Sequence, residues 1–307
     1  MKIILLSDIH LSTEKPTGRI DDWESAQWRK MEWVWRYAAE HEAIILQAGD
    51  LCDRPRNWIV LIKLISFLRT WNRVVYMVRG QHDMYFHSPD SSSTVQILDK
   101  LELVGLVEAN PGVLVGSEVS IAGIRWGEVE KINRPVAKQK TNILVIHAPI
   151  AEAPVFEKHD YIDARSFAEK HQEYDLILCG DIHRHFCIKT KWNTLLNTGP
   201  MIRRDVGEYN FRHEPCFYIY DTTTKELTKQ IIPHEPAEKV LSRQHLDGQQ
   251  EIKSLLSDFV EKVKQTLSKE SPGVDVMANF RRAINTVDIP QSTKALIMEV
   301  VNDQNGK

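Results

Sequence analysis

The sequence predicts an α/β fold, and three observations support this prediction. Short apolar runs typical of buried β-strands alternate with longer segments whose apolar residues recur at helical spacing. The length of 307 residues suits one large α/β domain with an appendage, or two domains. Several apolar runs end in aspartate or histidine, as expected of a sheet that carries a site at the carboxyl ends of its strands.

The composition is that of a globular chain, with 42% apolar and 26% charged residues. No apolar run approaches the roughly 18 residues of a membrane span, and the first apolar segment is too short for a signal peptide. We therefore expect a cytoplasmic protein with no membrane partner. The net charge of −3 argues against a generally basic nucleic-acid coat, but it does not exclude a nuclease that uses metals and local cations. The cysteines lack C-x-x-C spacing and are interpreted as reduced core thiols: Cys52, Cys179, Cys187 and Cys216.

The first hundred residues predict three buried strands with helices between them. We expect strands at 3–6, 43–46 and 74–78, and helices at 23–41, 57–71 and 94–101. Asp21 or Asp22 suits the N-cap of the first helix. The four tryptophans of that region are interpreted as packing beneath the sheet, with a platform for unstacked bases as the alternative. The second helix is apolar on more than one face, which predicts that it is buried twice or shared with another subunit.

The remainder of the chain predicts a second sheet and a helical C-terminal region. Residues 103–126 contain short strand-like segments broken by glycines. The elements expected next are strands at 143–146, 176–178, 186–188 and 195–196, a helix at 163–171, and a hairpin of residues 216–220 and 227–232. Beyond a boundary near residue 240, amphipathic helices are expected at 251–267, 276–285 and 291–301.

Metal-ligating side chains follow five of the predicted strands. The strand ends read Asp8-x-His10, Gly49-Asp50-x-x-Asp53, Gly80-Gln81-His82-Asp83, His147 and Gly180-Asp181-Ile182-His183. Because residues two apart on a strand share a face, the first pair projects together. Mixed carboxylate and imidazole donors suit Mn²⁺, Fe²⁺ or Zn²⁺ better than Mg²⁺ or Ca²⁺. Some seven donors imply two metals bridged by a carboxylate, an arrangement that activates water and clamps a phosphate. The pattern therefore predicts phosphoester hydrolysis.

The ordered motifs resemble those of the calcineurin-like metallophosphoesterases, which read D-x-H, G-D-x-x-D, G-N-H-D, H and G-H-x-H. The resemblance covers Asp8 to His185 and implies a two-sheet sandwich with helices outside and a dimetal site at one edge. It implies that Asp8 and His10 bind the first metal and that Asp50 bridges the two. His147 then binds the second metal.

The resemblance also assigns the residues around the second metal and the leaving group. Gln81 stands where the family has a metal-binding asparagine. His82 matches the histidine that protonates the leaving oxygen or steadies the phosphate, and Asp53 would orient it.

Two departures from the family pattern fall on the second metal. Gln81 is one methylene longer than asparagine, and Asp181 replaces the first histidine of the last motif, which leaves His183 for the first metal. These changes suggest a reshaped site, looser or of different metal preference. An alignment shifted by two would instead pair His183 with His185, but we prefer the one anchored on Gly180 because the glycine sets where the strand breaks. A degenerate, non-catalytic site is the remaining alternative.

Within the superfamily, the chain is most similar to the SbcD-type nuclease subunit of double-strand-break repair, at its start and in the segments 180–184 and 197–204. This similarity implies a nuclease domain at 1–205, a minimal capping region at 206–240 and a helical segment at 241–307. The segment would bind the coiled coil of an SMC-like ATPase. DNA would be the substrate of a manganese-dependent exonuclease or endonuclease, and the helices at 57–71 and 94–101 would form a homodimer. Other interpretations left open are a stand-alone phosphodiesterase or phosphatase and a scaffold. Arg203 and Arg204 either meet backbone phosphates or belong to a solvated turn.

Overall fold

The computed structural model describes residues 1–108, 112–132, 141–155, 160–244, 284–285 and 294. The chain divides into two compact units, Met1–Ser242 and Arg243–Lys307. The division lies close to the predicted boundary near 240. No division occurs at 205, because residues 206–240 belong to the first unit. The predicted helices beyond 250 fall almost wholly outside the described residues.

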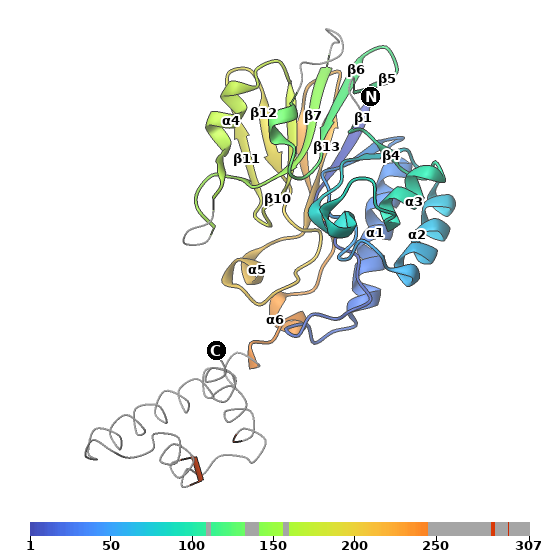
Figure 1. The fold of residues 1–307 in the computed structure, drawn as a ribbon. Coiled ribbons are helices and arrows are strands. Elements are labelled where there is room, and N and C mark those ends of the chain that lie inside the picture. The colour runs from blue at the N-terminus through green and yellow to red at the C-terminus, as the bar shows by residue number, and fades with distance from the viewer. Residues whose placement is uncertain (109–111, 133–140, 156–159, 245–283, 286–293, 295–307) are drawn as a thin grey trace, which may run out of the picture. The chain divides into compact units, whose positions relative to one another are not determined.

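The first unit contains two six-stranded sheets (Figure 1). The first sheet has the order β14-β13-β1-β2-β3-β4, in which β1 to β4 are parallel and the hairpin β13–β14 pairs with β1 through its antiparallel strand β13. Its strands are β1 (Lys2–Leu6), β2 (Ile44–Gln47), β3 (Val75–Met77), β4 (Gly105–Leu106), β13 (Cys216–Asp221) and β14 (Leu227–Ile231). The hairpin expected as a capping region therefore extends the first sheet, because β13 pairs with β1 along its length.

The second sheet has the order β11-β12-β10-β7-β6-β5, with parallel inner strands and an antiparallel strand at each edge. Its strands are β5 (Val113–Val115), β6 (Val119–Ile124), β7 (Thr141–Ala148), β10 (Leu176–Asp181), β11 (Phe186–Lys189) and β12 (Thr194–Asn197). A small parallel pair is formed by β8 (Ile150–Ala151) and β9 (Ile162–Asp163). The segment 103–126 thus contributes to both sheets, since β4 completes the first.

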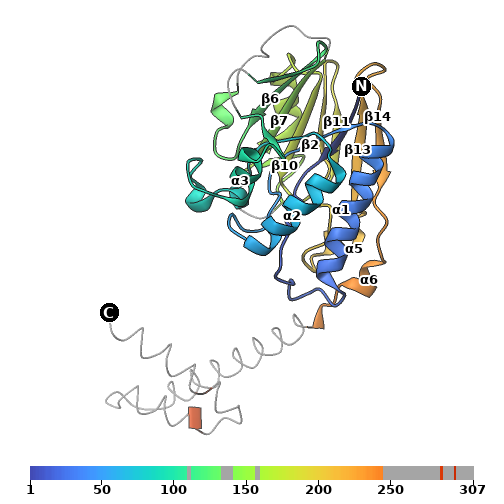
Figure 2. The ribbon, with the colours of Figure 1, turned by 90° about the vertical axis from the view of Figure 1, so that its right-hand side faces the viewer.

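Helices lie outside the two sheets, and in the view of Figure 2 α1 and α2 cover the first sheet. The helices are α1 (Trp23–Glu40), α2 (Trp58–Trp71), α3 (Thr94–Lys100), α4 (Ala164–Lys170), α5 (Glu208–Arg212) and α6 (Ala237–Val240). Short 3₁₀ turns occur at η1 (Gln81–Asp83), η2 (Tyr85–His87) and η3 (Val129–Lys131). Asp22 is the N-cap of α1, where its carboxylate accepts from the Ser25 amide.

The apolar core forms three layers around the sheets. Ile3 and Leu5 of β1 face the second sheet, whereas Ile4 and Leu6 face α1 and α2. A third cluster joins the outer face of the second sheet to α4. Because β1 is covered on both faces, it is a continuous apolar run rather than an alternating one. The predicted α/β sandwich with helices outside is confirmed.

The tryptophans of α1 pack in the core, which confirms the packing interpretation. Trp23 and Trp35 are fully buried, and Trp28 and Trp33 lie half-buried against the core.

Helix α2 differs from α1 in leaving apolar side chains exposed. It buries one face, yet three large apolar side chains on its other face are exposed: Trp58, Ile59 and Ile62.

The registers of both sheets bring the strand ends to one edge. Leu6 of β1 is level with Gln47 of β2, which is level with Met77 of β3. In the second sheet, Gly180 of β10 is level with His147 of β7. Side chains that follow these strands therefore start from neighbouring positions.

All four cysteines are free, and Cys187 is exposed while the other three are buried. The prediction of core thiols therefore holds for three of them. Within the described residues, no helix is both long and apolar enough to cross a membrane.

Candidate metal centre

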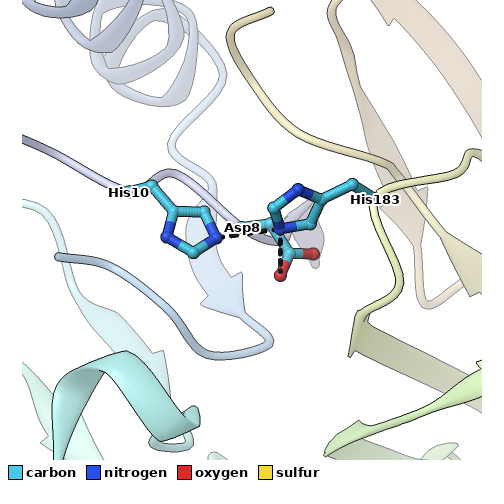
Figure 3. Close-up of side chains that lie close together, drawn as sticks. All are labelled: Asp8, His10 and His183. Atoms are coloured by element: carbon cyan, nitrogen blue, oxygen red, sulfur yellow. Dashed lines mark hydrogen bonds and ion pairs between the residues drawn. The ribbon is translucent and has the colours of Figure 1, made fainter. Parts of the chain in front are cut away.

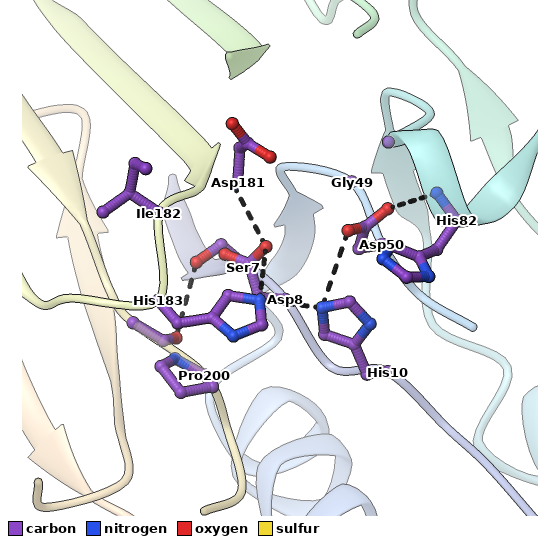
Figure 4. Close-up of polar contacts among 12 residues, drawn as sticks. Ser7, Asp8, His10, Gly49, Asp50, His82, Asp181, Ile182, His183 and Pro200 are labelled. Carbon is purple, nitrogen blue, oxygen red and sulfur yellow. Dashed lines mark hydrogen bonds and ion pairs between the residues drawn. The ribbon is translucent and has the colours of Figure 1, made fainter. Parts of the chain in front are cut away.

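The predicted ligands come together beyond the carboxyl ends of the strands (Figure 4). Three overlapping groups of side chains each place one donor atom per residue within 4.8 Å of the others. The groups are Asp8 with His10 and His183, His10 with Asp50 and His82, and Asp8 with Asp50 and His147. Because the groups share members, they form one continuous centre.

The first cluster contains Asp8, His10 and His183 (Figure 3). The Nε2 atoms of the two histidines lie 2.9 Å apart. The His183 Nε2 lies 3.7 Å from Asp8 Oδ1. Donor atoms that share one transition-metal ion lie about 3 Å apart when each bond is about 2.1 Å. The spacing therefore suits a single ion between these side chains.

Asp50 joins the first cluster to a second one. Its Oδ2 lies 3.5 Å from His10 Nε2 on one side and 3.4 Å from His147 Nε2 on the other. Its Oδ1 instead accepts a hydrogen bond from the backbone N–H of His82 at 2.9 Å. One carboxylate oxygen thus faces both clusters, as a bridging ligand must.

The second cluster is centred on His147 Nε2. Gln81 Oε1 lies 2.8 Å from this nitrogen, and Asp181 Oδ1 lies 3.8 Å from it. Gln81 also donates from Nε2 to Asp181 Oδ1 at 2.8 Å. The two side chains that depart from the family pattern are therefore direct neighbours.

The backbone at this edge adopts a conformation rare for residues with a Cβ. Asp8, His10 and Asp50 have φ values of 50°, 51° and 56°, and Asp181 has a φ of 95°. Left-handed φ in residues other than glycine costs free energy of about 1–3 kcal/mol each and is enriched at functional sites, although six further non-glycine residues of the described chain also have a positive φ. The fold thus stores strain at four of the predicted ligands.

Two of the motif glycines are required for different reasons. Gly49 has a φ of 92°, and a Cβ there would lie 2.3 Å from His147 Nδ1. Gly80 has an ordinary φ of −85°, but its Cβ would lie 2.0 Å from Asp50 Oδ1. Gly49 therefore permits a left-handed turn, whereas Gly80 is needed for close approach.

Backbone carbonyls fix the orientation of two histidine rings. His147 Nδ1 donates to the Ala48 carbonyl at 2.6 Å, and His82 Nδ1 donates to the Asp53 carbonyl at 2.8 Å. These bonds leave the Nε2 of each ring facing the centre. His147 is thereby prepared as a ligand and His82 as a proton carrier.

Asp53 contacts His82, as the resemblance implied, and it does so through its backbone carbonyl. The Asp53 carboxylate forms an ion pair with Arg204 and lies 3.8 Å from His10 Nδ1. The Arg204 side chain is 20% exposed beside the centre. The Arg203 side chain is buried, so Arg203 and Arg204 do not belong to a solvated turn.

Asp83 supports the centre, although its motif position gave no role in the sequence. Its buried carboxylate accepts from the backbone N–H groups of Asp50 at 2.8 Å, Cys52 at 3.2 Å and Gly80 at 3.1 Å. These bonds hold the turn that carries Asp50. No side-chain pattern could have shown this, because all the donors are backbone amides.

His185 lies outside the three ligand groups. Its Nε2 hydrogen-bonds to the Tyr218 hydroxyl at 2.7 Å, and its ring stacks on the Tyr218 ring. The alignment that uses His183 and His185 as a pair therefore has no support from the geometry.

The charges at the centre fit a bound cation. Burial raises the pKa of Asp8 and lowers that of His10 well below its usual value. Burial also opposes ionisation of both Asp50 and His147, but their mutual attraction lowers the pKa of Asp50 and raises that of His147. Asp8 Oδ2 and Asp50 Oδ2 are buried and accept no hydrogen bond from the described residues. Carboxylate oxygens of this kind are stabilised by metal coordination.

The residues that would hold the metals are therefore Asp8, His10, Asp50 and His183 for one ion, and Asp50, Gln81, His147 and Asp181 for the other. When bound, two divalent cations activate water and offset the charge on phosphate oxygens. His82 sits at the rim, with its ring centroid 5.0 Å from that of His10. Because Nδ1–H is held by a carbonyl, the imidazolium form of His82 presents an Nε2–H that can pass its proton to a leaving oxygen. This arrangement suits phosphoester hydrolysis.

Known structures resemble the chain only distantly. Solved structures that resemble the chain include a protein of Thermus thermophilus, at 10% identity and a TM-score of 0.48 over 76% of this chain and 99% of that one. An archaeal phosphodiesterase matches at 13% identity and 0.41, over 75% and 99%. Vps29 of Entamoeba histolytica, complexed with zinc, matches at 12% and 0.37, over 76% and 98%. Because every one of these TM-scores is below 0.5, the likenesses carry no inference.

A search of curated proteins found no match. The family model for calcineurin-like phosphoesterases matches residues 1–185, which is more than half of the chain and contains every ligand described above. The chain therefore belongs to the calcineurin-like phosphoesterase family.

Proposed function

We propose that this protein is a dimetal-dependent phosphodiester hydrolase that cleaves DNA, as a nuclease subunit in DNA repair or recombination. The observation that supports hydrolysis is the position of Asp50 Oδ2, which lies within 3.5 Å of a histidine on each side. Mn²⁺ is the proposed metal, with Fe²⁺ or Zn²⁺ as alternatives, because the donor set mixes imidazole with carboxylate.

The proposal of DNA as substrate rests on two supports. The first is the similarity of the segments 180–184 and 197–204 to the SbcD-type subunit. The second is Arg204, a partly exposed cation beside the metal centre, whose guanidinium pairs with Asp53 through one nitrogen and has further N–H groups for a backbone phosphate. Arg203 gives no such support, because its guanidinium donates to backbone carbonyls within the fold.

The proposed partners follow from the same similarity. We propose an SMC-like coiled-coil ATPase that binds the C-terminal segment 241–307, and a homodimer formed through α2 and α3. The exposed apolar face of α2 is the structural support for the dimer, since such side chains are usually covered by a partner.

A nuclease assay tests the proposal. The wild-type protein with Mn²⁺ is expected to shorten linear duplex or single-stranded DNA, and His82→Ala is expected to lower kcat by about 10²–10⁴-fold without loss of bound metal. His87→Ala is the matched control, because His87 contacts Trp126 instead of the centre. Activity on small chromogenic diesters without DNA cleavage would contradict the nuclease function and favour a stand-alone phosphodiesterase.

A scaffold function is the second candidate, and the contact of Gln81 with Asp181 favours it. Both residues depart from the family pattern at the second cluster. A protein that cleaves neither DNA nor small diesters with Mn²⁺, Fe²⁺ or Zn²⁺, yet binds an SMC-like ATPase, would be a scaffold.

A further inference from the structure

A basic cavity lies on the α1 side of the first unit, lined by a different set of residues from the metal centre. Its volume is about 450 Å³, within the range of small-molecule sites. One wall is a face of α1 that carries Arg29, Lys30 and Trp33. The cavity is also lined by Arg203 and by the segment 233–235 after β14.

Cations exceed acids along the walls of this cavity. Five arginine and lysine side chains line it against three carboxylates. Asp21 pairs with Arg19 and Glu32 pairs with Arg36, which leaves Arg29, Lys30 and Arg203 against Glu235. The cavity therefore presents a net positive charge.

Lys30 is the most unusual of these cations. Its residue is 8% exposed, and its Nζ has one hydrogen bond, to the Met201 carbonyl at 3.3 Å. No carboxylate of the described residues lies within ion-pair distance of it. Burial lowers the pKa of Lys30 to about 7, and the nearby charges of Arg19 and Arg203 act in the same direction. A buried ammonium without an anionic partner is costly, and a bound anion removes that cost.

Arg203 adds a second buried cation of the same kind. Its Nε donates to the His213 carbonyl at 2.9 Å and its Nη1 to the Glu235 carbonyl at 2.7 Å. These bonds hold the guanidinium in place, and its Nη2 has no hydrogen-bond partner in the described part of the chain. A fixed guanidinium next to an ammonium is a suitable pair for phosphate oxygens.

We propose that this cavity binds a phosphate-bearing anion of up to nucleotide size, with Lys30 and Arg203 as the cations that contact the phosphate. Arg29, exposed on the same face of α1, adds a longer-range attraction. The segment 201–204 separates this site from the metal centre, because Arg203 turns to the cavity and Arg204 pairs with Asp53. The site is proposed independently of the hydrolytic function.

Isothermal titration of the full-length, metal-loaded protein tests the proposal, with pyrophosphate and dAMP as probes. The wild type is expected to bind one more equivalent of probe per chain than Lys30→Met does. If the variant still binds this second equivalent, its affinity for it is expected to be at least about tenfold weaker than that of the wild type. Arg69→Gln is the matched control, because Arg69 is an exposed arginine on α2. Hydrolysis of a chromogenic diester is expected to be unchanged in both variants, which separates loss of this site from damage to the centre.

Two further measurements keep the test decisive. If Lys30→Met does not fold, Arg29→Gln is expected to weaken the second equivalent by a few fold at low salt, because it removes one screened charge. Oligonucleotides with and without a 5′-phosphate show whether the phosphate comes from a nucleic-acid end or from a free nucleotide. Equal stoichiometry and affinity in the wild type and the variants, for every probe, would overturn the proposal.

Discussion

At the scale of single residues, the second cluster raises the question of why two family positions differ. Gln81 and Asp181 are far apart in sequence, yet the Gln81 amide donates to the Asp181 carboxylate at 2.8 Å. The longer amide reaches both this carboxylate and His147 Nε2. We interpret the two departures as one coupled change, in which a carboxylate takes the place of an imidazole and a longer amide fills the space.

This interpretation predicts a strong coupling between the two positions. Gln81→Asn alone and Asp181→His alone are each expected to weaken binding of the second metal by about 10–100-fold, since each leaves its partner misplaced. The double variant is expected to recover most of the affinity, because it recreates the family pair. Metal titrations of the four proteins measure the coupling. Additive losses would show that the two changes are unrelated.

Lys30 predicts a pH dependence of stability that its replacement removes. Burial and the charges of Arg19 and Arg203 lower its pKa in the fold from 10.5 to about 7, while Asp21 opposes this and His234 lines the same cavity. The unfolded chain therefore binds one more proton than the fold between these values, so stability rises with pH in this window.

The free energy of unfolding of the wild type is expected to rise relative to that of Lys30→Met by up to about 1.4 kcal/mol per pH unit above pH 7. Urea denaturation of both proteins at about pH 7.0, 7.75 and 8.5, without phosphate, measures the difference. Parallel pH profiles would mean that Lys30 has an ordinary pKa.

At the scale of elements, most helices and strands were predictable because the burial of each element determines the pattern of apolar residues in its own sequence. β1 and β7 are covered on both faces and appear as continuous apolar runs. Pairing between distant segments was not predictable. One of the two partners of β1 is β13, which lies near the other end of the first unit, and periodicity carries no information about which strand lies beside it.

The exposed face of α2 belongs to the same scale, and it predicts self-association. Trp58 and Ile62 are 65% and 68% exposed. If they form the core of a homodimer, replacing both with glutamate should shift the protein to the monomer in sedimentation experiments, because two charges would be buried at the interface. The fold should be little affected, since neither side chain packs in the core.

Leu114→Glu is the control for this experiment, because Leu114 is 48% exposed on β5 of the other sheet. A dimer that survives both changes in α2 would exclude this face as the interface. A wild-type protein that is monomeric at all concentrations would contradict the proposed homodimer itself.

At the scale of the whole molecule, the site is made by two sheets that meet at one edge. The sequence identified the donors because each follows a strand, and parallel strands place their carboxyl ends together. It did not reveal how the donors are held. Asp83 and the Asp53 carbonyl act through backbone groups, which have no sequence signature. The strained φ values of Asp8 and Asp50 likewise appear only in the folded chain.

The central claim is that Asp50 bridges two divalent cations, and anomalous diffraction from crystals grown with Mn²⁺ tests it most directly. The expected result is two manganese peaks about 3.5–4 Å apart, one on each side of Asp50 Oδ2. One peak should lie near His10 and His183, and the other near His147 and Gln81. A single peak, or peaks that avoid Asp50, would contradict the account.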